Sequence, residues 1–144
     1  EPHELPDFRE QFFGSFEGID SEIVATTMSA YTTKNFTTYS DLVTEYGMAE
    51  TMNTIRLADP FDFAENDEQW WTRVSHGFAD IRDRHQDGDN VLIVSHGTTI
   101  RGIAEKLNRH DLASDAVKNG ALMQIELLPN SANISRFNDD STVF

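Results

Sequence analysis

The feature that most constrains the fold is an unbroken apolar run over residues 91–95 (VLIVS), followed at once by His96-Gly97-Thr98. A short run of this kind, rich in β-branched side chains, is typical of a parallel strand covered on both faces. A helix is expected to begin at Thr98 or Thr99, because apolar residues recur after it with helical spacing. They are Ile100, Ile103, Ala104 and Leu107. A strand that runs directly into a helix predicts a layered α/β fold.

The rest of the chain is expected to add helices before this strand and a hairpin after it. Residues 1–18 contain Pro and Gly at close intervals, which predicts loops or short turns. Helices are expected over residues 20–31, 40–46 and 49–57, and a longer one from Asn66 or Asp67 to about residue 85. The longer helix carries one apolar stripe at helical spacing, made of Trp71, Val74, Phe78 and Ile81. Residues 122–127 and 134–137 are expected to form two final strands joined by a turn.

Length and composition fit a single domain over residues 1–144, with a formal net charge of −14. A surface this acidic repels phosphate backbones and anionic headgroups, so neither nucleic acid nor membrane is expected as a partner. No apolar run approaches the roughly 20 residues that cross a bilayer, and the start of the chain is no secretory signal. A cytoplasmic location is therefore expected. Because cysteine is absent, disulfides and thiolate metal sites are excluded.

The end of the predicted strand is the first candidate site. Ligands of α/β folds bind at the carboxyl ends of strands, and a helix start presents free N–H groups that suit an anion. Gly97 would let the backbone approach such a ligand, Thr98 adds a hydroxyl, and His96 could donate to a phosphoryl oxygen. These local donors would bind an anionic ligand despite the repulsion from the acidic surface. Taken alone, the segment also fits a simple turn with a solvated histidine.

The second candidate is the aromatic segment over residues 8–18, which holds four Phe and the carboxylates Glu10 and Glu17. A carboxylate that aromatic rings shield from water is a candidate general acid. Taken alone, the segment also fits Phe side chains that cover the core beside two solvated carboxylates.

Together these segments resemble the histidine phosphatase superfamily, the phosphoglycerate mutase-like proteins. Residues 8–18 are similar to that family's L-R-E-x-x-F-G-x-W-E-G segment, with Phe8 for Leu and Phe16 for Trp. Residues 91–101 are similar to its second-histidine motif, V-x-x-V-S-H-G-x-x-I-R. Asn119-Gly120, a strand, a turn and residues 136–139 resemble its ending. The three motifs follow one another in the family's order.

The resemblance implies a role for each matching residue. Glu10 would be the general acid that protonates the leaving alcohol, and His96 would stabilise the transferring phosphoryl group. Gly97 and Thr98 would touch the phosphate. Arg101 would brace the site by pairing with a carboxylate, and Glu17 would have a structural role. The implied reaction is hydrolysis of a small phosphate ester through a phosphohistidine, without metal or cofactor.

The resemblance also implies a three-layer α/β/α sandwich, with residues 91–95 as a central strand and the last two strands toward an edge. The family's Arg-His-Gly nucleophile segment has no counterpart in this chain. None of its remaining histidines has that context; they are His3, His76, His85 and His110. We therefore expect an N-terminally incomplete domain that is inactive and unstable alone. An upstream segment or a second copy of the chain is expected to complete it.

Two alternative functions stay open. A phosphoglycerate mutase would return the phosphoryl group to its substrate, but Gln11, Phe12 and Phe13 replace the basic and polar residues that mutases have after the catalytic Glu. A non-catalytic phosphate-binding module would have lost the nucleophile altogether. An upstream Arg-His-Gly strand in the encoding gene would argue against the module.

Overall fold

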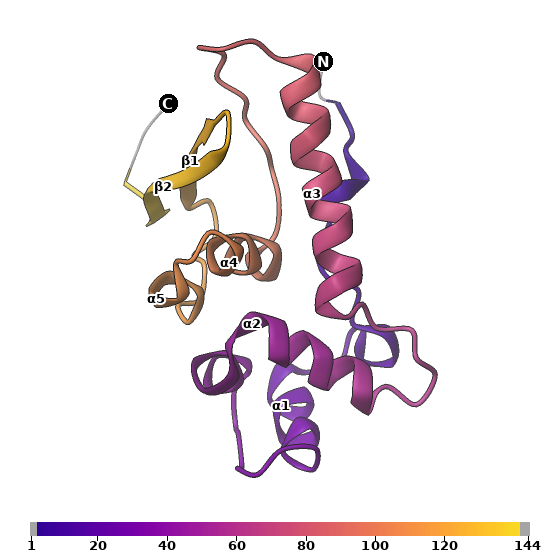
Figure 1. Cartoon of the computed structure of the whole chain (residues 1–144). Coiled ribbons are helices and arrows are strands. Elements are labelled where there is room, and N and C mark those ends of the chain that lie inside the picture. Colours follow the sequence, from indigo (N-terminus) through magenta and orange to yellow (C-terminus); the bar gives the residue numbers. More distant parts are fainter. Residues whose placement is uncertain (1–2, 142–144) are drawn as a thin grey trace.

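The computed structural model describes residues 3–141 as a set of helices followed by a two-stranded hairpin (Figure 1). The helical part comprises the 3-10 turns η1 (Pro6–Phe8) and η2 (Gly14–Phe16) and the helices α1 (Ser21–Ser29), α2 (Tyr39–Ala58), α3 (Asp67–Arg84), α4 (Gly97–Lys106) and α5 (His110–Ala113). The hairpin consists of β1 (Leu122–Leu128) and β2 (Ser131–Asp139). No helix in this part of the chain is long and apolar enough to cross a membrane.

The helices begin where the sequence places its capping residues. Asp20 accepts the Glu22 N–H at the start of α1. Thr38 and Asn66 each form a reciprocal capping box at the starts of α2 and α3. A side-chain oxygen at these positions satisfies one of the N–H groups that a first helical turn leaves free. The predicted helices over residues 20–31 and from Asn66 to about 85 are therefore confirmed.

Helix α2 is interrupted at Gly47, whose φ of 80° and ψ of 171° are not helical. The predicted pair of short helices corresponds to the two halves on either side of this kink. The second half begins with the N–H groups of Met48 and Ala49, which donate to Glu105 at 2.7 and 2.9 Å. A Cβ at Gly47 would lie 2.9 Å from Glu105 Oε2, so both the backbone conformation and the space favour glycine here.

Two apolar clusters form the core. The larger one joins α2, α3, α4 and α5 and is centred on Trp70, which has no exposed surface. Of the predicted stripe, Val74, Phe78 and Ile81 are buried in this cluster, and Trp71 is partly buried and packs against it. Trp70 is the more deeply buried of the two indoles because its ring packs against Gly102 of α4, which has no side chain. The smaller cluster joins α1 to α2; it contains Val24, Ala25, Met28, Phe36, Leu42, Ile55, Ala58 and Ala64.

The predicted hairpin is present, but the predicted strand over residues 91–95 is not formed. Strands β1 and β2 pair antiparallel, and they are the only paired strands in the described part of the chain. Residues 91–95 belong to the connection between the end of α3 and the start of α4, where the Ser95 hydroxyl donates to the Phe8 carbonyl at 2.7 Å but no described strand pairs with the segment (Figure 1). Leu92 and Val94 are 73% and 88% exposed. A parallel strand needs a neighbouring strand and cover on both faces, and residues 3–141 offer this segment no strand partner.

Candidate active site

Glu10 lies where the loop after η1 meets the N-terminal end of α4. Its Oε2 accepts the Thr98 N–H at 3.1 Å. Its Oε1 accepts the Thr99 N–H at 2.9 Å and the Gln11 N–H at 3.0 Å, and the Thr99 hydroxyl, which also faces the Arg9 carbonyl, lies 3.0 Å from it. The first N–H groups of a helix have no partner within it, and the helix dipole favours a negative charge there. Glu10 therefore caps α4 from a position 89 residues before Thr99.

The predicted phosphate-binding residues lie at the same helix start. His96 is the N-cap residue of α4, and its exposed side chain makes no capping hydrogen bond. Gly97 and Thr98 are half-buried in the first turn. Within residues 3–141, no hydrogen bond uses the Gly97 N–H or the Thr98 hydroxyl. The two sequence motifs thus meet at the N-terminal end of α4, where the Gly97 N–H and the Thr98 hydroxyl remain available to a ligand.

The aromatic segment divides between the core and the surface. Phe8 is buried and packs edge-on against Phe78, with 5.2 Å between ring centroids, whereas Phe12 is 42% exposed. The Glu10 carboxylate is half-buried, and its polar contacts are the N–H donors at the start of α4; its shielding by phenylalanine rings stays a prediction. Glu17 accepts the Phe13 N–H at 2.7 Å, a contact that fits the structural role expected for it.

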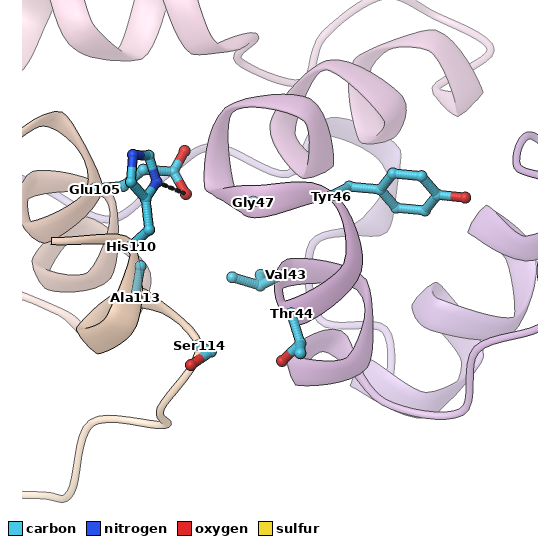
Figure 2. Close-up of a pocket in the computed structure, with 8 residues that line it drawn as sticks. All are labelled: Val43, Thr44, Tyr46, Gly47, Glu105, His110, Ala113 and Ser114. Atoms are coloured by element: carbon cyan, nitrogen blue, oxygen red, sulfur yellow. Dashed lines mark ion pairs between the residues drawn. The ribbon is translucent and has the colours of Figure 1, made fainter. Parts of the chain in front are cut away.

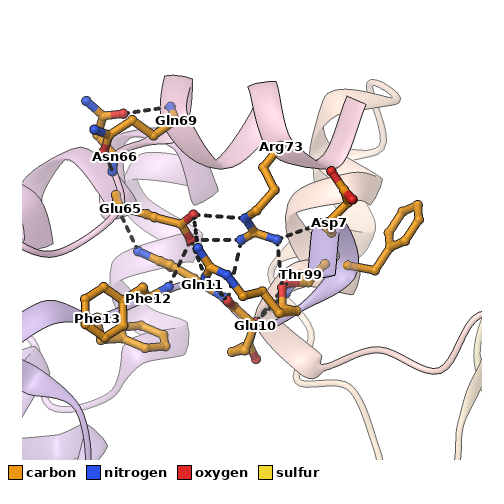
Figure 3. A network of polar contacts seen from close by, with 12 residues as sticks. Asp7, Glu10, Gln11, Phe12, Phe13, Glu65, Asn66, Gln69, Arg73 and Thr99 are labelled. Atoms are coloured by element: carbon orange, nitrogen blue, oxygen red, sulfur yellow. Dashed lines mark hydrogen bonds and ion pairs between the residues drawn. The ribbon is translucent and has the colours of Figure 1, made fainter. Parts of the chain in front are cut away.

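Figure 3 shows an ion-pair network beside Glu10 that the sequence did not reveal; Glu65 and Arg73 are largely buried in it, and Arg9 is 45% exposed. The Glu65 carboxylate pairs with Arg9 at 2.7 Å and with Arg73 at 2.8 Å. It also accepts the Phe12 N–H at 3.0 Å. Burial raises the pKa of the Glu65 carboxyl, but hydrogen bonds from Arg73, Phe12 and Arg9 outweigh burial and hold the pKa below its usual value. Because 56 positions separate Arg9 from Glu65, no local pattern could have predicted the pair.

Within residues 3–141, Arg101 forms no ion pair with a carboxylate, unlike the pairing that the resemblance implied. Its Nε donates to the Ala113 carbonyl at 2.6 Å, and one terminal nitrogen donates to the Ser114 carbonyl at 3.0 Å. Its guanidinium carbon lies 5.5 Å from the centroid of the Tyr39 ring. The last carbonyls of a short helix lack partners within the helix. Arg101, which is 5% exposed, therefore joins α4 to the end of α5.

A separate hollow of about 310 Å³ lies between α2 and the α4–α5 region (Figure 2). None of the predicted site residues lines it; its lining is Val43, Thr44, Tyr46, Gly47, Glu105, His110, Ala113 and Ser114. Glu105 lies 3.7 Å from His110 Nδ1, but its oxygens already cap the second half of α2. No group of three or more His, Cys, Asp or Glu that could hold a metal ion is found in the described part of the chain, this hollow included.

Comparison with known proteins identifies the family. The model of the histidine phosphatase superfamily (branch 1) matches residues 1–140. A crystal structure of phosphoglycerate mutase from Bacillus anthracis str. Sterne superposes with a TM-score of 0.82 at 24% identity, over 92% of this chain and 58% of that chain. No curated protein matches. The fold is thus that of phosphoglycerate mutase, and the chain spans 58% of the mutase's length. With its motifs meeting at the start of α4, the chain belongs to the histidine phosphatase superfamily.

Proposed function

We propose that the protein is a phosphomonoesterase that acts on a small phosphate ester through a phosphohistidine intermediate. The observation that carries the proposal is the meeting of Glu10 with the His96-Gly97-Thr98 segment at the N-terminal end of α4. A carboxylate, an exposed imidazole and a helix start with uncommitted donors suit the transfer of a phosphoryl group. Family membership supports the same reaction class.

The proposed reaction has two steps. A neutral imidazole nitrogen, supplied from outside residues 1–144, attacks phosphorus; the bond to the leaving oxygen breaks, and Glu10 gives that oxygen its proton. Water then attacks phosphorus and the P–N bond breaks. Glu10 takes the proton from water, so inorganic phosphate leaves and the free histidine returns. His96, the Gly97 N–H and the Thr98 hydroxyl would stabilise the charge on the phosphoryl oxygens in both steps.

The two oxygens of Glu10 are not equivalent for this proton transfer. Within residues 3–141, Oε1 accepts the N–H groups of Thr99 and Gln11 and lies 3.0 Å from the Thr99 hydroxyl, whereas Oε2 accepts the Thr98 N–H alone. Protonation of Oε2 would disturb one contact, and protonation of Oε1 would disturb at least two. We therefore assign the transferred proton to Oε2.

The alternatives differ in what they do with the phosphoryl group. A mutase would return it to the substrate, and the exposed Phe12 two residues after Glu10 supports a phosphatase with a less polar substrate group instead. A binding module would bind phosphate without turnover. Product analysis with an aryl phosphate and with phosphoglycerates separates the three: free phosphate, isomerised phosphoglycerate or neither.

We also infer that residues 91–95 are completed by an additional strand from an N-terminal segment of the same domain. Their apolar side chains are exposed, and burying each would stabilise the fold by about 1.5–3 kcal/mol. In the matched mutase, the 42% of the chain that lies outside the 58% matched is long enough to supply such a strand. The alternative is that a second copy of the chain supplies the neighbouring strand, and the test must distinguish the two sources.

One pair of preparations tests both proposals: residues 1–144 alone, and the same chain with its upstream coding region. We expect only the longer protein to hydrolyse an aryl phosphate, to yield a trapped phosphohistidine and to protect the amides of residues 91–95 from exchange. A short chain that turns over, with the phosphohistidine on one of its own five histidines, would refute the missing nucleophile. Protection of residues 91–95 in a dimer of the short chain would refute the N-terminal strand.

A further inference from the structure

A partly buried network joins α3 to the loop that carries Glu10. Glu65 is 9% exposed, and both of its oxygens accept hydrogen bonds from guanidinium groups. Arg73 donates to it from Nε at 2.9 Å and from a terminal nitrogen at 2.8 Å. Arg9 donates to it at 2.7 and 3.1 Å. Two-point contacts between guanidinium and carboxylate fix orientation as well as distance.

The same network holds the main chain on both sides of Glu10. The other terminal nitrogen of Arg73 donates to the carbonyls of Asp7 at 2.6 Å and Arg9 at 3.1 Å, which precede Glu10. Glu65 accepts the Phe12 N–H at 3.0 Å, which follows it. A guanidinium offers five N–H donors in a rigid plane, so one arginine can serve both a carboxylate and the backbone. The Cα of Glu10 is thereby fixed relative to α3.

Helix α4 holds the same loop from the other side. The Thr99 hydroxyl donates to the Arg9 carbonyl at 2.9 Å and lies 3.0 Å from Glu10 Oε1. The Arg9 carbonyl therefore contacts both Arg73 of α3 and Thr99 of α4. Displacing the loop from α3 would change where the Glu10 carboxylate meets the helix start.

We propose that Arg73 and Glu65 are positioning residues that set the place of the Glu10 carboxylate for proton transfer. The proposal rests on the proposed function of Glu10. Neither residue contacts the helix start itself; the contacts found run through the loop. A misplacement of about 1 Å can cost about a hundredfold in rate, so the network would control turnover without touching the phosphate.

The experiment uses the active, full-length protein with Arg73→Lys and Glu65→Gln. Lysine keeps the charge of Arg73 but cannot reproduce its planar set of donors. Arg84→Lys is the matched control, because Arg84 is also on α3 and its contacts are Asp80 at 2.7 Å and His3 at 2.9 Å, neither of which belongs to the loop between Phe8 and Gly14. Two readouts are needed: kcat and KM for an aryl phosphate, and amide exchange at Thr98 and Thr99, with Met52 of the core as internal reference.

We expect Arg73→Lys and Glu65→Gln to lower kcat by about ten- to a hundredfold with KM nearly unchanged, because proton transfer affects the transition state alone. Exchange at Thr98 and Thr99 should accelerate about tenfold more than at Met52. Arg84→Lys should change neither readout. In a Glu10→Gln background, Arg73→Lys should cause no further loss of kcat.

Two results would overturn the positioning role. One is that Thr98, Thr99 and Met52 accelerate equally, which would make the network a general stabiliser. The other is that the losses from Glu10→Gln and Arg73→Lys multiply, which would make them independent. An unmodified protein without phosphatase activity would instead defeat the proposed function, and amide exchange would still decide the placement of Glu10.

Discussion

Replacement of Glu10 by alanine is expected to destabilise the protein, whatever it does to turnover. A carboxylate kept only for catalysis is usually neutral or costly for stability, so its removal would leave stability unchanged or raise it. Glu10 instead accepts three backbone N–H groups, two of them from Thr98 and Thr99 at the start of α4. The sign of the change in unfolding free energy therefore distinguishes a helix cap from a purely catalytic group.

The size of the effect follows from the contacts. Loss of a helix cap costs about 0.5–2 kcal/mol, and loss of a negative charge at a helix start costs about 0.3–1 kcal/mol. We therefore expect Glu10→Ala to lower the free energy of unfolding by about 1–3 kcal/mol. Glu10→Gln keeps one acceptor oxygen for the donors at Oε1 but loses the charge, so about 1 kcal/mol is expected.

Urea denaturation of the active protein, followed by circular dichroism, measures these differences. Glu17→Ala is the control, because Glu17 lies in the same segment but accepts only the Phe13 N–H, in an exposed contact. Its replacement should change stability by less than about 1 kcal/mol. If Glu10→Ala were as stable as the unmodified protein, or more stable, the cap would contribute nothing and the argument would fail.

Three further variants probe the packing, the ion pairs and the junction with α5. Gly102→Ala would place a Cβ 2.6 Å from the buried Trp70 ring. The cost of overpacking, about 1–3 kcal/mol, should exceed the gain of about 1 kcal/mol that alanine usually brings to a helix, so Tm should fall. A rise in Tm would contradict this. The pKa of Glu65 in the folded protein lies below its unfolded value of about 4.3. Glu65 therefore contributes to the free energy of unfolding above that pH, and this contribution is lost as the pH falls through the folded pKa. In Glu65→Gln, the free energy of unfolding should therefore fall less steeply between pH 6 and pH 3 than in the unmodified protein. Equal pH dependence in the two proteins would contradict this. Arg101→Met removes the donors to two carbonyls at the end of α5 and should cost about 1.5–3 kcal/mol in urea, whereas no loss would show that these contacts are weak.

Local sequence rules were sufficient for most helices and for the hairpin. Asn66 and its capping box start α3 where the sequence predicted. Gly47 divides α2 into the two segments that were expected. Strands β1 and β2 follow from two apolar runs and a short turn. Each of these features depends on residues a few positions apart, so spacing and propensity suffice to predict them. The family followed from motif order, and the model match over residues 1–140 confirms it.

Tertiary structure decided what distant residues do to one another. The sequence placed Trp71 on the buried stripe, whereas in the structure Trp70 is fully buried and lies against Gly102. The family resemblance implied a carboxylate partner for Arg101, but its guanidinium donates to two carbonyls at the end of α5. The capping of α4 by Glu10 joins residues 89 positions apart. Likewise, residues 91–95 have the composition of a strand but no strand beside them. Composition determines which segments can be buried or paired, whereas hydrogen bonds and ion pairs form only with the groups that the fold brings within about 3 Å.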